Sequence, residues 1–424
     1  MKSLIIISII FLQLPFLGWS QSSVSLDSCI SWAYDHFAYE SQAMAYRESA
    51  ELADINVRKK TWYPKFVLDA NATYQNENIE LALPENIPGF ESPQVPLNFN
   101  RVLVNFNQAI YDGSVSANQR KLEQSKYSIL EQKIETDKIQ VKSKVTGVYM
   151  SILLTSDNIA LLESKRSVVA ERLKVIKSAS EYGSVTLVSL KSLQAEILKI
   201  DQQIIEAEHS RKTLYLSLSE ITGKDIPDLS ELLKPAPIVD FNNNVENRPE
   251  IRLMNMQIEN FELQKGMIGT SRNVRINAFG NVGGGYPGYN IFKDEVAPMA
   301  LIGIKLQWNI LAYGTVKNEK QILSINQNIT LNEQNRARIQ FVTELKTQQQ
   351  EVLKMQDLLS SDDQMIALRT EITKIKAAEL DNGTITSTDY ITELNQEEEA
   401  KLNQKIHELK LILAKLNYLT IQGN

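Results

Sequence analysis

Cysteine, proline, glycine and histidine are all scarce in this chain. Its 424 residues include one cysteine, 12 prolines, 17 glycines and three histidines. A single cysteine excludes an intrachain disulfide, and the low glycine and proline content favours a protein made mostly of helix. His36, His209 and His407 lie far apart in the sequence without ligand spacing, so we expect no metal site.

Basic charge is lacking as well. The formal net charge is −6, and no stretch interleaves lysine or arginine with aromatic residues, which argues against a nucleic-acid partner. No nucleophile and base form a recognisable catalytic pattern, and the run Gly283-Gly284-Gly285 is not followed by a helical pattern, as a phosphate-binding loop would be. We therefore expect neither an enzyme nor a bound cofactor.

Long apolar runs are missing after the N-terminus. Lys2 precedes an apolar run up to Leu17, and a small-residue cleavage site follows, so residues 1–20 are predicted to be an export signal. No later run reaches the roughly 18 apolar residues of a spanning helix. Any membrane part of the exported chain must therefore be β-structure. Cys29 lies inside a helical pattern beyond the signal, which favours a buried side chain over lipid attachment.

The chain contains the same pattern twice. Ile110-Tyr111-Asp112-Gly113-Ser114 joins an alternating stretch to a long helical tract, and Leu311-Ala312-Tyr313-Gly314-Thr315 does so again. Glycine interrupts each tract, at Gly183 and at Gly383. This duplication predicts two structural repeats, each with a short helix, two strands and a long helical hairpin. We assign them to residues 21–222 and 249–424, with residues 223–248 as the linker.

Two strands are predicted in each repeat because apolar and polar residues alternate there. A helix over residues 25–61 comes first. The alternating stretches cover residues 66–75, 101–110, 274–282 and 300–310, with a loop at 283–298. Soluble antiparallel sheets also alternate in this way, but the strand length and the aromatic residues near strand ends favour a membrane barrel. These aromatics are Trp62, Tyr63, Tyr74, Trp308 and Tyr313.

The helices that follow the strands are unusually long. Between Ser114 and Tyr182 only Gly147 weakens the pattern, and about 69 residues at 1.5 Å each would reach about 100 Å. Such a rod must pack along other rods to bury one face. Apolar residues recur at steps of three and four or at heptad spacing, as in coiled-coil seams. The clearest runs are Tyr127, Ile134, Val141 and Val148; Leu190, Leu193, Ile197, Ile200 and Ile204; and Leu402, Ile406, Leu409, Leu413 and Leu416.

Four strands per chain cannot close a barrel, and an open edge in lipid leaves backbone groups without partners. If these are membrane strands, the chain must therefore form oligomers. Three copies would supply about twelve strands, enough to enclose a water-filled lumen. The fold class predicted from the sequence is thus mainly α with a membrane β part.

Several segments resemble the TolC family of outer-membrane channel proteins, and the resemblance covers nearly the whole exported chain. The segments that carry it are Leu26-Asp27-Ser28-Cys29-Ile30-Ser31-Trp32-Ala33, Tyr63-Pro64-Lys65-Phe66, Gln108-Ala109-Ile110-Tyr111-Asp112-Gly113, Trp308-Asn309-Ile310-Leu311-Ala312-Tyr313-Gly314 and Gly383-Thr384-Ile385-Thr386-Ser387-Thr388-Asp389. The chain departs from the family where a proline is expected, at Ala109 and Asn309, and where an aspartate is expected, at Ser189.

The resemblance implies a homotrimer whose twelve-stranded barrel lies in the lipid of the outer membrane and continues into a helical tunnel across the periplasm of a Gram-negative-type cell. It also implies two partners, a periplasmic adaptor (membrane fusion) protein and an inner-membrane transporter of the RND or ABC type. The chain would then be a passive exit duct for small molecules or polypeptides. A periplasmic coiled-coil scaffold or adaptor without channel activity is the alternative.

Site residues follow from the same resemblance. Asp389 would form a ring of carboxylates at the periplasmic gate, with Thr392 one turn further on and Ser189 as its counterpart in the first repeat. Asp389 also suits the first turn of a helix, where the helix dipole stabilises its negative charge. The hairpin tips, which would dock the adaptor or simply cap helices, are Gly183, Ser184, Gly383 and Thr384. Residues predicted to line the barrel lumen are Asp69, Asn71, Lys305 and Gln307. Glu397-Glu398-Glu399 is predicted to be a solvated helix face.

Overall fold

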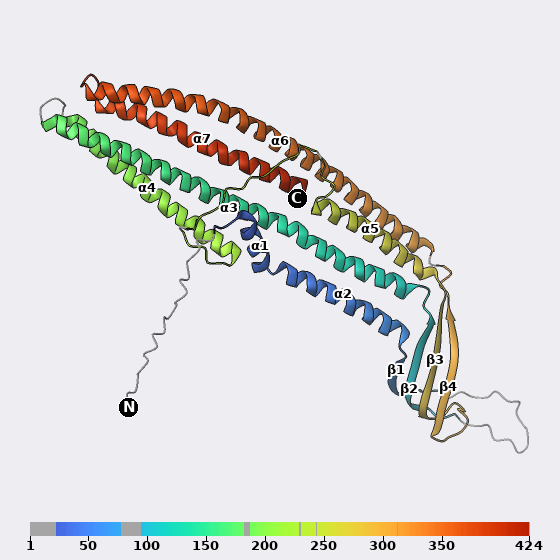
Figure 1. Ribbon diagram of the computed structural model, residues 1–424. Coiled ribbons are helices and arrows are strands. Elements are labelled where there is room, and N and C mark those ends of the chain that lie inside the picture. Colours follow the sequence, from blue (N-terminus) through green and yellow to red (C-terminus); the bar gives the residue numbers. More distant parts are fainter. Residues whose placement is uncertain are drawn as a thin grey trace, which may run out of the picture. The chain divides into compact units, whose positions relative to one another are not determined.

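The computed structural model describes residues 23–77, 95–181, 187–228, 230–242, 244–311 and 313–423. Its elements follow the predicted order of short helices, two strands and a long helical hairpin, given twice (Figure 1). In chain order they are α1 (Leu26–His36), α2 (Tyr39–Trp62), β1 (Lys65–Tyr74), β2 (Asn98–Tyr111), α3 (Val115–Glu181), α4 (Leu187–Thr222), α5 (Pro249–Gly269), the 3₁₀ turn η1 (Thr270–Arg272), β3 (Arg275–Tyr286), β4 (Ala297–Gln307), α6 (Tyr313–Asp381) and α7 (Ser387–Gln422).

The N-terminal helix predicted over residues 25–61 is two helices. Ser25 caps α1 by accepting a hydrogen bond from the Ser28 backbone N–H at 3.2 Å. The helix stops at Phe37 because Ala38 takes a left-handed conformation with φ of 54°. An alanine there gives no sequence signal for a break, since this residue type favours helix interiors.

The strands differ from their predicted limits mainly in the second repeat. The run Gly283-Gly284-Gly285, placed in a loop by the sequence, lies inside β3, and Ala297 already begins β4. The loop is therefore confined to residues 287–296. Glycine is required at position 283 because a Cβ there would collide with the carbonyl oxygen of Val102 on the neighbouring strand.

Asp112 makes the sharp passage from β2 into α3 possible. Its carboxylate accepts hydrogen bonds from the backbone N–H groups of Ser114 at 3.0 Å and Ser116 at 2.6 Å. These are among the donors that the first turn of a helix leaves unpaired. The pKa of Asp112 is lowered: burial acts to raise it, but the hydrogen bonds from Ser116 and Ser114 outweigh that effect.

The chain divides into two compact units, and α3 and α6 each contribute residues to both of them. The first unit holds the described residues up to Phe37, Ile139–Phe241 and Lys346–Thr420. The second holds Ala38–Lys138, Asn242–Leu345 and Ile421–Asn424. Both predicted repeats supply segments to each unit, because the long helices run from one unit into the other.

Two apolar clusters hold the first unit together, where α4 runs beside α3 and α7 beside α6 (Figure 1). One cluster packs α1 and the linker against α3 and α4. In it the hydroxyl of the fully buried Tyr149 donates to the backbone oxygens of Val24 and Leu233, both at 2.7 Å. The other joins α3, α4, α6 and α7 and includes Leu193 and Ile200 of the predicted seam, both 0% exposed. The coiled-coil pattern is thus confirmed for this part of the chain.

The second unit contains α2, α5, parts of α3 and α6, and the sheet, which lies at the ends of these helices (Figure 1). Polar contacts link these helices: Asn260 of α5 donates to the Ser125 hydroxyl of α3 at 2.9 Å, and Arg120 of α3 pairs with Asp54 of α2. The sheet has the order β1-β2-β3-β4, and every neighbouring pair is antiparallel. Its outer strands, β1 and β4, have no partner strand on their free sides among the described residues.

One expectation about apolar stretches is wrong. Within the described residues, α3 contains an 18-residue window that is apolar and long enough to cross a membrane by composition and length alone. Val145, Tyr149 and Ile152 of this helix are fully buried within the first unit, so part of its apolar composition belongs to the core of that unit. Cys29 is fully buried in the same cluster, and burial raises the pKa of its thiol to about 11.

Candidate functional site

The sheet has two chemically different faces. Because side chains alternate along a strand, the pairing of Asp69 with Leu103 and Gly283 with Met299 places Asp69 and Met299 on one face. The same register places Asn71, Lys305 and Gln307 on this face with Asp69, and all four of these residues are exposed. We call it the polar face, although Val67, Leu103, Phe279 and Leu301 also belong to it.

An open concavity runs along the polar face over β1 and β2. It is lined by Asp69, Asn71, Thr73, Gln75, Phe99, Arg101, Leu103 and Asn105. The structure therefore brings together two of the four predicted lumen residues, Asp69 and Asn71, on the lining of one concavity. Lys305 and Gln307 lie on the same face at the other edge of the sheet, on β4.

The opposite face is apolar and exposed in the chain. Phe66 contacts Phe106 across the strands, with ring centroids 5.6 Å apart. Further along this apolar face Leu68 is 69% exposed and Ile302 is 85% exposed. A face of this size is too apolar to be left in water. A soluble sheet would cover it with helices, whereas a membrane strand presents it to lipid.

The tip between α6 and α7 is a compact helix end. The N–H of Gly383, at φ of 70°, donates to Leu380 O at 3.0 Å, and the N–H of Thr384 donates to Glu379 O at 3.0 Å. This pair of bonds satisfies the last carbonyls of α6, and its left-handed position favours glycine. The predicted capping role of Gly383 is therefore present in the structure. Gly183 and Ser184, predicted for the first tip, lie outside the described residues.

Asp389 closes the first turn of α7 in a reciprocal cap. Its carboxylate accepts from the Thr386 hydroxyl at 2.7 Å and from the Thr386 N–H at 3.0 Å, and its own N–H donates to the Thr386 hydroxyl at 3.2 Å. The hydrogen bond from the Thr386 side chain is the main reason why the pKa of Asp389 is lowered. The side chain remains exposed, as does Thr392 one turn further on, whereas Ser189 is buried in the first turn of α4.

We expect the Asp389 cap to make the tip sensitive to acid. A carboxyl group whose pKa is lowered by folding stabilises the fold above its unfolded pKa of about 3.9, and this contribution is lost as the pH falls through the folded value. Asp389→Asn should therefore be nicked at the tip by proteases faster than the wild type at neutral pH. As the pH falls below the folded pKa of Asp389 the two rates should converge, because asparagine resembles the protonated acid.

The control for this experiment is Thr392→Val. Thr392 is exposed and donates only within its own helix, to Thr388 O at 2.9 Å. The ratio of the nicking rate of Thr392→Val to that of the wild type should stay near one at every pH. A ratio for Asp389→Asn that does not change with pH would show that the charge of Asp389 does not stabilise the turn.

A link between the two helical hairpins was not predicted from the sequence. The Arg172 guanidinium of α3 pairs with Asp381, the last residue of α6, and lies 5.2 Å from the ring centroid of Tyr390 on α7. Tyr390 is 2% exposed and belongs to the cluster that joins all four helices. Asp381 and Tyr390 flank the predicted Gly383 turn, but Arg172 is one of many charged residues on α3, and nothing in its local sequence distinguishes it.

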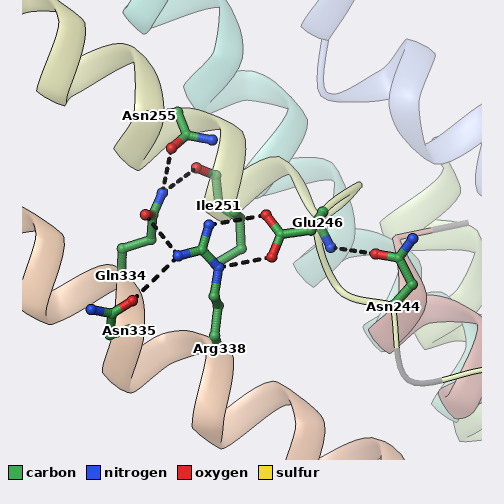
Figure 2. Close-up of polar contacts among 7 residues, drawn as sticks. All are labelled: Asn244, Glu246, Ile251, Asn255, Gln334, Asn335 and Arg338. Carbon is green, nitrogen blue, oxygen red and sulfur yellow. Dashed lines mark hydrogen bonds and ion pairs between the residues drawn. The ribbon is translucent and has the colours of Figure 1, made fainter.

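A second polar cluster fixes the linker to the helices of the second unit (Figure 2). Arg338 of α6 forms two bonds with Glu246 of the linker, at 2.8 and 2.9 Å, and donates to the Gln334 side chain at 3.0 Å. Gln334, 2% exposed, donates in turn to Asn255 at 2.6 Å and to Ile251 O at 3.3 Å, both on α5. The linker is thus bound to α5 and α6 through side chains that satisfy one another.

One predicted surface is partly buried. Glu397, expected on a solvated face, is 6% exposed; its carboxylate accepts from Thr370 of α6 at 3.1 Å and pairs with Lys401 at 2.7 Å. Only Glu399 of the three glutamates is exposed. The prediction failed because local composition does not show which side of α7 faces α6. Among the described residues no cluster of histidine, cysteine and acidic side chains has the arrangement of a metal site.

Comparison with known proteins identifies this architecture. Residues 41–224 match the family model described as outer membrane efflux protein. No curated protein sequence matches the chain. The predicted family resemblance is therefore confirmed by that segment and, over most of the chain, by a shared fold.

Solved structures of outer-membrane proteins show this fold at low sequence identity. VceC from Vibrio cholerae is 13% identical, with a TM-score of 0.69 over 94% of this chain and 96% of its own. CusC, whose structures concern conformational changes that accompany folding and transmembrane channel formation, is 12% identical. Its TM-score is 0.72 over 94% of this chain and 92% of its own. The CmeC outer-membrane channel of Campylobacter jejuni is 15% identical, with a TM-score of 0.68 over 94% and 85%.

Proposed function

Because the chain has the fold of outer-membrane efflux channels, we propose that it is the passive outer-membrane duct of a tripartite export system. The observation that carries the proposal is the sheet of four strands with one polar face, one exposed apolar face and two edges that no other described strand pairs with. Three copies joined edge to edge would pair every strand, present the apolar face to lipid and enclose the polar face.

The helical hairpins would then form the periplasmic part of the duct. In this arrangement Asp389 and Thr392 lie near the tips, where three copies would bring three carboxylates together at the entrance. The tips at Gly383 and Thr384 would be available to a periplasmic adaptor, and an energised inner-membrane transporter would supply the cargo. The duct itself contributes passage and does no chemistry.

A scaffold or adaptor without channel activity fits the sheet less well. Such a protein needs no strands of ten or more residues with an exposed apolar face, and a soluble antiparallel sheet buries that face. The helical hairpins alone fit both functions, so the sheet is the feature that separates them.

Reconstitution in a planar bilayer tests the proposal. The purified protein should form trimers that conduct ions, and Asp389→Ala should raise the conductance or weaken its preference for cations, because a ring of like charges attracts counter-ions. Glu399→Ala, which removes an exposed carboxylate from the same helix away from its first turn, is the control. A monomer that stays in water and never conducts would exclude the duct and favour the scaffold.

A further inference from the structure

The loop between β3 and β4 folds back over the polar face of the sheet. This segment, residues 287–296, lies at the end of the sheet away from the helices, because α2 leads into the start of β1 and β2 leads into α3. Tyr289 donates its hydroxyl to the Asn281 side chain at 2.6 Å. Asn281 pairs with Leu301 and with Asn105 and so belongs to the polar face. Since β3 continues to Tyr286, the loop must reverse along its own strand to reach it.

The end of the polar face nearest this loop is packed. Pro287 and Gly288 of the loop are buried, and Met299 is 1% exposed. A Cβ on Gly285 would lie 2.9 Å from the Arg101 Cγ and 2.9 Å from the Met299 Sδ. The two long side chains therefore occupy the space that glycine leaves open. The Nε of Arg101 is fully enclosed here, whereas Asp69, Lys305 and Gln307 on the same face are exposed.

We propose that this loop, which we call the inward loop, narrows the extracellular mouth of the duct and determines the largest molecule that can enter it from outside. The inference rests on the proposed function, which makes the polar face the wall of the lumen. In that arrangement the end of the sheet opposite the helices faces the exterior. Each chain then adds one inward loop to the rim, held over the lumen wall by the bond from Tyr289 to Asn281.

The bond from Tyr289 to Asn281, which holds the inward loop over the polar face, is suited to adjust the opening and is not needed for folding. Tyr289 is 48% exposed, so its hydroxyl can exchange Asn281 for water at little cost. The rest of the loop remains attached at both ends to long strands and through the bond from the Tyr286 hydroxyl to the Asp294 carboxylate. Substitution at either Tyr289 or Asn281 should release the Tyr289 part of the loop from the polar face, while that second bond and the ladder between β3 and β4 remain intact.

A cysteine placed in the lumen tests the inference from the outside of the cell. Gln307→Cys lies on the polar face at the helix end of β4, beyond the inward loop. The native thiol, Cys29, is fully buried and its pKa is raised to about 11, so it should not react. Intact cells are treated with a small charged maleimide or with a polyethylene glycol maleimide. We expect the small reagent to label Gln307→Cys and the large one to label it slowly.

Adding Tyr289→Phe or Asn281→Ala to Gln307→Cys should raise the rate of labelling by the large reagent several-fold and leave the small reagent unaffected. Tyr74→Phe is the matched control, since Tyr74 is a tyrosine at the same end of the sheet on the apolar face. Unchanged labelling by the large reagent in both loop variants would overturn the inference. If even the small reagent fails to label Gln307→Cys, the polar face does not line an open lumen and the proposed duct itself fails.

Discussion

Ile302→Lys is expected to remove the protein from the outer membrane, whereas Leu301→Lys is expected to leave it there. The two residues are neighbours on β4, but they point to opposite faces. Ile302 lies on the apolar face and is 85% exposed, and Leu301 lies on the polar face. Lysine at the middle of a lipid-facing strand costs about 2–4 kcal/mol in each copy, so a trimer would bear roughly three times that cost.

The measurement is the amount of folded trimer in the outer-membrane fraction, compared with the total amount of exported protein. Ile302→Lys should be exported but found outside the membrane or degraded. Leu301→Lys is the control, because it places the same charge at the adjacent position, toward water. Equal recovery of both variants would show that the apolar face does not contact lipid.

The second large effect is expected at the link between the helical hairpins. Arg172→Met should raise the conductance of the reconstituted protein, because it removes the pair with Asp381 and the contact with the Tyr390 ring. The Arg172 side chain is 16% exposed and that of Asp381 is 43% exposed, so each link is worth only about 1 kcal/mol. If three links in a trimer break together, about 3 kcal/mol shifts the balance between closed and open tips roughly a hundredfold.

Arg166→Met provides the control for this prediction. Arg166 also lies on α3, but it pairs at 2.5 Å with Asp201 of α4, within the same hairpin. Its loss should leave the conductance unchanged, while Asp381→Asn should reproduce the effect of Arg172→Met. If Arg172→Met conducts like the wild type, the link does not hold the tips closed.

Patterns that repeat along the sequence predicted the fold well. The alternation around Phe66 and Ile302 and the seam through Leu193 and Ile200 each follow from the period of one element, which local sequence contains. The break at Ala38 did not follow, because alanine favours helix interiors and its left-handed conformation carries no local signal. The strand position of Gly283 was missed for a related reason, since the need for glycine comes from the backbone of the adjacent strand.

The candidate site was predictable to a similar extent. Asp69, Asn71, Lys305 and Gln307 share a face because register follows from alternation, and Asp389 follows its glycine turn in sequence. The partner of Asp381 was not predictable, because Arg172 is about 200 residues away and meets it only when four helices pack together. The position of the inward loop was not predictable either, since only the folded chain shows that Tyr289 turns back toward Asn281.

The two free edges of the four-stranded sheet have a genetic consequence in the proposed trimer. In each chain, β1 must pair with one neighbouring chain and β4 with the other. A single subunit whose edge strand cannot pair therefore prevents the barrel from closing. When normal and faulty chains are made in equal amounts and mix at random, only about one trimer in eight contains normal chains alone. A mutation in an edge strand should therefore act as a dominant one, and a loss of the whole protein as a recessive one.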